Sequence, residues 1–191
     1  LKPKGQFNNL EAVTNEVKLM MDPNIDPFAA TADDGSAPDK FGASDVQDLN
    51  KIQLLNAYTC TECGRCTSEC PANQTGKKLS PRKIMMDTRD RLVEVGINID
   101  ANNGEFIPDN KQLLGDYITN EELWACTSCN ACVEACPISI DPLSIILEMR
   151  RYLVMEQSAA PMELNTMMSN IENNGAPWPY NQMDRLNWKN E

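Results

Sequence analysis

All eight cysteines of this 191-residue chain fall into two runs with the same spacing, C-x2-C-x2-C-x3-C, and a proline follows each run. This spacing is typical of proteins that bind two 4Fe-4S clusters, because three closely spaced thiolates can bind three irons of one cube while the fourth cysteine points elsewhere. The first run consists of Cys60, Cys63, Cys66 and Cys70. The second run consists of Cys126, Cys129, Cys132 and Cys136.

In paired runs of this form, the fourth cysteine of each run binds the cluster of the other run. We therefore expect the first cluster to be bound by Cys60, Cys63, Cys66 and Cys136. The second cluster is expected to be bound by Cys126, Cys129, Cys132 and Cys70. The two runs must then pack face to face, and no iron keeps an open position for a substrate. This favours the relay of single electrons, and no catalytic residue is predicted in the chain.

Disulfides and zinc are the other common uses of clustered cysteines, and both fit this sequence poorly. Disulfide scaffolds are short secreted domains, whereas this chain has 191 residues and no recognisable signal peptide. Structural zinc sites use two separated pairs, often with histidine, whereas each run is a tight quartet and the chain has no histidine. The lack of histidine also excludes Rieske ligation, histidine-bound haem and histidine acid-base catalysis within these residues.

The composition restricts the partners and the stability of the chain. A formal net charge of −11 argues against nucleic acid and favours proteins with basic docking surfaces. Only 41% of the residues are apolar and 6% are aromatic, so bonds to shared clusters are expected to hold the fold together. No window approaches the ~18 apolar residues of a transmembrane helix. Because the chain begins with Leu1, we expect it to be part of a longer polypeptide, which leaves room for a membrane domain upstream.

The elements that must position the cysteines are helices, and they repeat. A helix capped by Ser44 or Asp45 is predicted to run to Tyr58, directly before the first cysteine run. A helix capped by Asn120 is predicted to lead through Trp124 into the second run. The two aromatics stand two residues before the first ligand of each run, which indicates an internal duplication. They could shield cluster sulfurs from water, or they could be ordinary core aromatics.

A second helix is predicted after each run, and both begin with a capping residue followed by proline. Ser80 and Pro81 start the first of these helices, and Gly96 is predicted to end it. Asp141 and Pro142 start the other, which is apolar on most sides. We expect this helix to be buried in the core of the domain or covered by a partner.

The two ends of the chain are expected to form arms around a central domain. An amphipathic helix is predicted over Asn8–Met21, followed by an irregular connector. A helix over about Pro161–Asn173 should stop at Gly175, and the apolar tail beyond it could dock on a partner or fold back on the domain. The predicted division is residues 1–43 for an N-terminal helix and linker, 44–157 for the dicluster domain, and 158–191 for a C-terminal helix and docking tail.

Two segments between the runs carry weaker predictions. Turn residues at 102–104 and 108–110 favour a short hairpin around Glu105–Ile107. A basic segment could raise the reduction potential of the first cluster, dock an acidic partner or form an ordinary solvated helix face. Its basic residues are Lys77, Lys78, Arg82, Lys83, Arg89 and Arg91.

The chain resembles the alpha-helical ferredoxin domain found in the C-type iron-sulfur subunit of heterodisulfide reductase and in the iron-sulfur subunit of anaerobic glycerol-3-phosphate dehydrogenase. The succinate dehydrogenase iron-sulfur subunit is more distantly similar. The resemblance covers about Phe41 to Trp188 and is carried by Leu55–Cys66, Cys70–Ala72, Thr75–Lys77, Leu79–Pro81, Asp87–Asp90, Trp124–Thr127 and Pro177–Trp178. It implies an all-α fold, an alpha-helical ferredoxin with two 4Fe-4S clusters and irregular N- and C-terminal arms.

The chain looks most like heterodisulfide-reductase-related proteins in which such a domain follows a membrane-embedded, haem-binding domain. Many of these proteins continue into cysteine-rich CCG domains, but this chain has no ninth cysteine, so a CCG module would be on a separate polypeptide. The implied function is an electron relay between a membrane quinone or haem module and a CCG-type partner, at the cytoplasmic face of the inner membrane. This favours a non-catalytic subunit or domain of an oxidoreductase complex. The alternative is a structural or sensory module that clusters hold together without turnover.

Overall fold

The computed structural model describes residues 14, 17–18, 21–23 and 40–189. The predicted helix over Asn8–Met21 and the connector that follows it lie mostly outside these residues. Within the described part, no helix has both the length and the apolar character needed to cross a membrane.

The described part of the chain is helical, as predicted, and contains no β-strand beyond an isolated bridge between Leu114 and Ile118. The first half contains η1 (Val46–Asp48) and α2 (Lys51–Tyr58) before the cysteine run, α3 (Arg65–Ser68) within it, and α4 (Pro71–Gln74) and α5 (Pro81–Ala101) after it. The second half contains η2 (Leu113–Tyr117), α6 (Asn120–Ala125), α7 (Ala131–Glu134), α8 (Pro142–Arg151) and η3 (Tyr152–Glu156). The chain continues into α9 (Met162–Asn174) and η4 (Gln182–Lys189).

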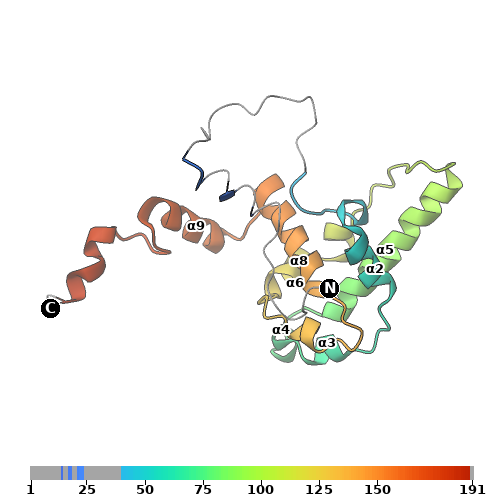
Figure 1. The fold of residues 1–191 in the computed structure, drawn as a ribbon, viewed down its shortest axis with the longest axis horizontal. Helices are drawn as coiled ribbons and strands as arrows, with labels where there is room; N and C mark the ends of the chain where they lie inside the picture. The colour runs from blue at the N-terminus through green and yellow to red at the C-terminus, as the bar shows by residue number, and fades with distance from the viewer. Residues whose placement is uncertain (1–13, 15–16, 19–20, 24–39, 190–191) are drawn as a thin grey trace.

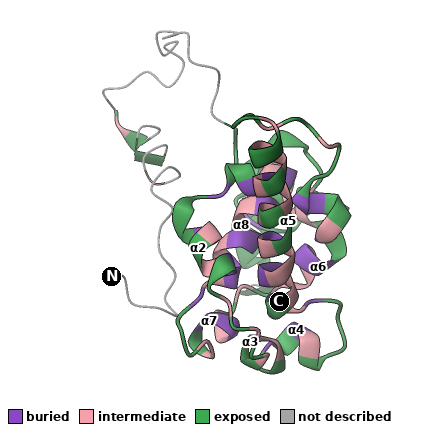
Figure 2. Cartoon of the chain, turned by 90° about the vertical axis from the view of Figure 1, so that its right-hand side faces the viewer, coloured by how far each residue is buried: buried purple, intermediate pink, exposed green. Residues whose placement is uncertain are grey.

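The centre of the molecule is the packing of α5 against α8, with α2 on α5 and α6 on α8 (Figure 1). The buried apolar side chains of these two central helices include Ile84, Met85, Val95, Ile145, Ile146 and Met149. The short helices α3, α4 and α7 lie at one end of this bundle (Figure 2). Because α3 belongs to the first cysteine run and α7 to the second, their contact brings the two runs side by side.

The helix predicted between residue 44 and Tyr58 is wrong in one respect, because the structure divides it in two. Asp45 caps η1, and α2 then starts afresh with Asn50 as its cap. The Asn50 carboxamide oxygen accepts hydrogen bonds from the amides of Ile52 and Gln53, which favours a new helix start at this point. In the second half, Thr119 and not Asn120 is the cap of α6, in a capping box with Glu122.

The helix after the first run is longer than predicted, and the predicted hairpin is absent from the described residues. Gly96 lies within α5, whose end comes after Ala101, because apolar packing continues beyond the glycine through Ile99. The Asn98 side chain then accepts from the Ile107 amide and donates to its carbonyl, both at 2.9 Å. Both backbone groups of Ile107 are thereby occupied by a side chain, and a partner strand is not needed.

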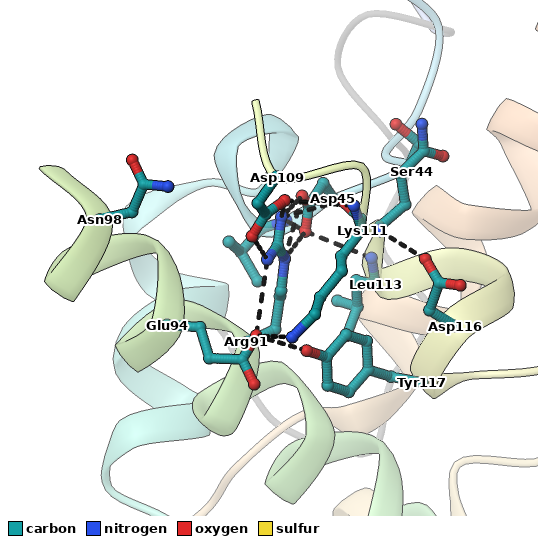
Figure 3. A network of polar contacts seen from close by, with 12 residues as sticks. Ser44, Asp45, Arg91, Glu94, Asn98, Asp109, Lys111, Leu113, Asp116 and Tyr117 are labelled. Atoms are coloured by element: carbon teal, nitrogen blue, oxygen red, sulfur yellow. Dashed lines mark hydrogen bonds and ion pairs between the residues drawn. The ribbon is translucent and has the colours of Figure 1, made fainter. Parts of the chain in front are cut away.

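A buried arginine joins the middle of α5 to two other segments (Figure 3). The Arg91 side chain is 0% exposed and donates to both carboxylate oxygens of Asp45, with Nη2 to Oδ2 at 2.8 Å. It also donates to both oxygens of Asp109 and to the carbonyl of Lys111. The hydrogen bond from Arg91 lowers the pKa of the Asp109 carboxyl from 3.8 to about 2. The residue before η1 and the segment after α5 are therefore fixed to one guanidinium.

The C-terminal arm extends away from the bundle (Figure 1). Helix α9 ends at Gly175, as predicted, and this glycine has the left-handed conformation that favours glycine at a helix end. Neither α9 nor η4 has a buried residue. The exposed apolar side chains of the arm include Met162, Met168, Ile171, Trp178, Tyr180, Met183, Leu186 and Trp188. The interpretation in which this segment folds back on the domain is therefore wrong for this conformation.

Candidate iron-sulfur centres

The two cysteine loops have the same backbone conformation. In the first loop, Glu62 and Gly64 have φ values of 56° and 82°. In the second loop, the corresponding residues Ser128 and Asn130 have φ values of 56° and 63°. Each loop thus turns through two left-handed residues between its first and third cysteines, and a short helix starts after the second of them. The internal duplication inferred from the sequence is therefore present in the backbone.

One pocket collects cysteines from both runs. Its lining includes Cys60, Cys63 and Cys66 of the first run together with Cys132 and Cys136 of the second. Met85, Ile138, Ile140 and Pro142 form apolar parts of its wall. The fourth cysteine of the second run therefore lies in the same pocket as the first three cysteines of the first run, and Cys132 lies there too.

The remaining cysteines gather around Cys126 and Cys132. Burial raises the pKa of the Cys126 thiol, and the neighbouring Cys70 and Cys129 add to the increase. Burial, followed by the nearby Cys126, Cys66 and Cys70, raises the pKa of the Cys132 thiol to about 12. Cys70 and Cys132 are buried, whereas Cys129 is exposed. A thiolate at Cys132 therefore needs a strongly positive ligand, and iron is such a ligand.

The residues present fit iron-sulfur clusters. All eight cysteines are free thiols in this structure, so each of them is available as a ligand. Among the described residues, no group of three or more histidine, cysteine, aspartate or glutamate side chains converges as it would around one metal ion. A cube with a separate iron for each thiolate holds its ligands further apart than a single ion does, so this spacing is compatible with clusters. The donor sets consist of sulfur alone, which suits iron-sulfur chemistry.

Backbone amides already point at ligand sulfurs. The Ser128 amide donates to Cys126 Sγ at 3.4 Å, and the Ile140 amide donates to Cys136 Sγ at 3.2 Å. Such hydrogen bonds stabilise negative charge on sulfur and contribute to the reduction potential of a cluster.

The aromatic residues before the two runs have different environments. Trp124 packs against the core, whereas the Tyr58 side chain is 63% exposed. The expectation that both aromatics shield sulfurs or belong to the core is therefore wrong for Tyr58. Its helix buries Gln53 and Ala57 instead and turns the tyrosine outward.

The basic segment between Lys77 and Arg91 is largely compensated within the chain. Lys78 pairs with Glu121 at 2.7 Å, and Lys83 pairs with Asp87 at 2.7 Å and with Glu122 at 2.9 Å. The pairs with Glu121 and Glu122 join α5 and the turn before it to the start of α6. A freely charged helix face is therefore not formed here, although Arg82 lines the pocket of the first centre.

Sequence reasoning missed Arg150, which is attached to the second cysteine loop. Its guanidinium donates to the carbonyls of Leu123 and Cys126 and lies 3.3 Å from Ser128 Oγ. It also stacks on the Trp124 ring, 4.9 Å from the centroid. The duplication could have revealed it, since Arg150 follows Pro142 at the same interval as Arg89 follows Pro81.

Residues 59–140 match the family model of the 4Fe-4S dicluster domain. A probable iron-sulfur-binding oxidoreductase, FadF, of Bacillus subtilis is 34% identical over 80% of this chain and 26% of its own length. The EtfAB:quinone oxidoreductase of Syntrophomonas wolfei is 34% identical over 79% of this chain and 24% of its own length. The C-type subunit of the ferredoxin/F420H2-dependent CoB-CoM heterodisulfide reductase of Methanosarcina acetivorans is 32% identical over 62% of this chain and 60% of its own length.

The chain thus spans about a quarter of the length of the first two relatives. The similarity includes both cysteine runs, and the matched domain accounts for two 4Fe-4S clusters as cofactors. The predicted electron-transfer role in oxidoreductase and heterodisulfide-reductase-like proteins is confirmed at this general level. The chain contains a 4Fe-4S dicluster domain and is homologous to the C-type and D-type subunits of heterodisulfide reductases and to FadF-like iron-sulfur oxidoreductases.

Proposed function

We propose that this chain relays single electrons between a membrane quinone or haem module and a CCG-type, heterodisulfide-reductase-like partner. The observation that carries the proposal is the position of Cys136 in one pocket with Cys60, Cys63 and Cys66. Two interlocked sets of four thiolates saturate the irons and hold the two centres close together. Such a pair can pass electrons but has no open iron for a substrate.

The proposed ligand sets define two centres. The first centre is formed by Cys60, Cys63, Cys66 and Cys136, and the second centre by Cys126, Cys129, Cys132 and Cys70. A 4Fe-4S cluster accepts and releases one electron at a time when bound. The chain holds its thiolates in place from both halves, lines the first centre with Met85 and Ile140, and donates backbone amides to sulfur.

The names of relatives support the two classes of partner. The Syntrophomonas wolfei relative is called a quinone oxidoreductase, and a 32% identical relative from Chromohalobacter salexigens is called a probable membrane-anchored ferredoxin. Other relatives are subunits of heterodisulfide reductases. We place the chain at the cytoplasmic face of the inner membrane, with the membrane module on the same longer polypeptide or on a separate one.

The test uses the native, full-length protein, purified anaerobically from membranes. Mass spectrometry and haem absorbance identify a CCG-domain subunit and a haem module in the same complex. Addition of a quinol should then produce the EPR signal of reduced 4Fe-4S clusters, and oxidised CCG partner should remove it. Clusters that no physiological donor reduces would overturn the relay and leave a structural or sensory module. A protein that is reduced by a ferredoxin-like donor and purifies without a membrane module would overturn the assignment of partners.

A further inference from the structure

The two arginines at equivalent positions of the duplication contact equivalent loop residues. Arg89 on α5 pairs with Glu62, two residues after the first cysteine of its loop. Arg150 on α8 reaches Ser128, two residues after the first cysteine of the other loop. An arginine at the same helix position therefore contacts the same loop position in both halves. The loop residue is a charged glutamate in the first half and a neutral serine in the second.

The charge of Arg89 is compensated where it lies. Its guanidinium forms ion pairs with Glu62 and with Asp90, the latter at 3.1 Å. Arg82 also lines the pocket of the first centre, but it is exposed, and water and salt screen an exposed charge. The first centre is thus surrounded by cations that are paired or solvated.

Within the part of the chain that the structure describes, Arg150 forms no ion pair with an acidic side chain. Its hydrogen bonds go to the neutral carbonyls of Leu123 and Cys126 and to the Ser128 hydroxyl, and its flat face lies on Trp124. Burial lowers its pKa, and the Cys126 thiolate acts against that decrease. An arginine nevertheless stays charged at neutral pH, so a positive charge is fixed against the loop of the second centre.

Two features of the second centre should lower its reduction potential. Cys70 and Cys132 are buried, and a low dielectric disfavours the extra negative charge of a reduced cluster. Asp141 lies near Cys132, although its carboxylate also accepts from the Ser144 amide at the start of α8. A cation in direct contact with the Cys126 carbonyl offsets both, because the same low dielectric strengthens its attraction for added negative charge.

We propose that Arg150 is the positioning residue that raises the reduction potential of the second centre, whereas Glu62 cancels the corresponding effect of Arg89 at the first centre. The inference rests on the proposed relay and its crossed ligand sets. An electron from a one-electron donor, such as a reduced haem, is thereby drawn toward the second centre. The donor loses one electron and the centre gains one, with no bond formed or broken and no proton transferred.

The experiment is an EPR-monitored redox titration of the full-length holoprotein and its variants. In Arg150→Gln, one of the two reduction steps should move to lower potential while the other stays in place. We expect at least a tenfold change in the distribution of one electron between the centres, which corresponds to ~59 mV for a one-electron couple. Arg151→Gln is the matched control, because Arg151 is the next residue and pairs with Glu148 away from the loop.

Two further variants exchange the charges of the halves. Ser128→Glu gives Arg150 the partner that Arg89 has, and it should lower the same step that Arg150→Gln lowers. Glu62→Gln removes the main partner of Arg89, and it should raise the other step. Arg150→Lys retains the positive charge without the planar guanidinium. Its reduction step should therefore stay closer to that of the unmodified protein than the step of Arg150→Gln does.

The outcomes separate this inference from the proposed relay. Unchanged potentials in Arg150→Gln and Ser128→Glu, with both centres still reversibly reducible, overturn the role of Arg150 and leave the relay intact. Equal shifts of both steps would also overturn it, since the effect would then not be local. If Arg150→Gln fails to retain its iron, Ser128→Glu and Arg150→Lys still decide the question. Centres that cannot be reduced in the unmodified protein overturn the relay itself.

Discussion

The two halves of the duplication share their ligand loops but differ in what surrounds them. The loops at Glu62 and Ser128 both turn through two left-handed residues, yet α2 turns Tyr58 to solvent while α6 packs Trp124 beneath Arg150. The first half is also fixed by the buried Arg91, which pairs with two carboxylates, whereas among the described residues Arg150 of the second half bonds only neutral groups. The difference shows that the conformation of the cysteine loops is maintained in two different environments. Those environments are what should set the reduction potential of each centre and the stability of each half.

The largest expected effect comes from removing iron, which tests whether the halves are independent. Each half contributes a cysteine to the centre of the other, so both should unfold together in one transition. We expect the melting temperature followed by circular dichroism to fall by about 20 °C or more, given metal-ligand free energies on the order of 10 kcal/mol and ~2–4 °C per kcal/mol. Two separate transitions in the apo-protein would show that each half folds by itself.

The next largest effect is expected from Cys70→Ser, which tests the exchange of ligands between the halves. This cysteine belongs to the first run, but the change should perturb the centre of Cys126, Cys129 and Cys132. Loss of that cluster would remove about half of the iron. Iron analysis and Mössbauer spectra should show the other centre unchanged, and Cys136→Ser should give the mirror result. Loss of the centre containing Cys60 from Cys70→Ser would disprove the crossed arrangement.

A smaller effect is expected from Asp109→Asn, which acts on the first half alone. The pKa of Asp109 is lowered from 3.8 to about 2 in the folded chain, so its stabilisation is present above pH ~4 and is lost as the pH falls toward 2. At neutral pH the shift in pKa corresponds to at most about 2 kcal/mol of the free energy of unfolding. We expect Asp109→Asn to lose less than this, because the carboxylate is 26% exposed and solvent screens its charge.

The rate at which cluster absorbance bleaches measures this loss in the Asp109→Asn protein and the unmodified protein. The variant should bleach faster above pH 5, and the difference should shrink as the pH falls toward 3. A constant difference across this range would show that the ionised carboxylate is not the cause.

The last comparison is between the two aromatics, of which one should match Asp109→Asn in its effect on stability and the other should have the smallest effect of all. Trp124→Ala removes a partly buried ring and the stacking surface of Arg150, and it should cost roughly 2 kcal/mol. Tyr58→Ala removes an exposed ring and should change stability by less than ~0.5 kcal/mol. Thermal unfolding of the two holoproteins measures both. Equal losses would mean that Tyr58 is covered in solution, which would indicate a partner or a second copy on α2.

Cysteine spacing predicted the cofactors, and helix caps predicted much of the fold. Ser80 with Pro81, Asp141 with Pro142, and Gly175 mark helix ends in the structure because local backbone chemistry decides them. The break at Asn50 and the continuation of α5 through Gly96 were not predicted. The first depends on a side-chain bond that competes with a single helix, and the second on packing against distant residues.

The missed features of the site are long-range in sequence. The burial of Arg91 between Asp45 and Asp109, and the contact of Arg150 with the second loop, join segments that no local pattern relates. The six basic residues near α5 were treated as one charged surface, whereas their partners lie in other segments such as the start of α6. Only a comparison of the two repeats, position by position, would have revealed Arg150 from the sequence.

In mechanical terms, α5 is a stiff helix that is attached to the rest of the chain at two separate points. Near its first turn, the Ser80 hydroxyl lies 2.9 Å from the Thr67 hydroxyl of the first cysteine run, and its middle is clamped to Asp45 through Arg91. The clamp lies ten residues beyond Pro81, or ~15 Å along the helix axis. A force applied to the segment before Asp45 is therefore carried into α5, the helix that also contacts the first cysteine loop through Thr67 and Glu62. Because one helix holds both the segment before η1 and the first cysteine loop, we expect the two to move as one unit when a neighbouring module shifts.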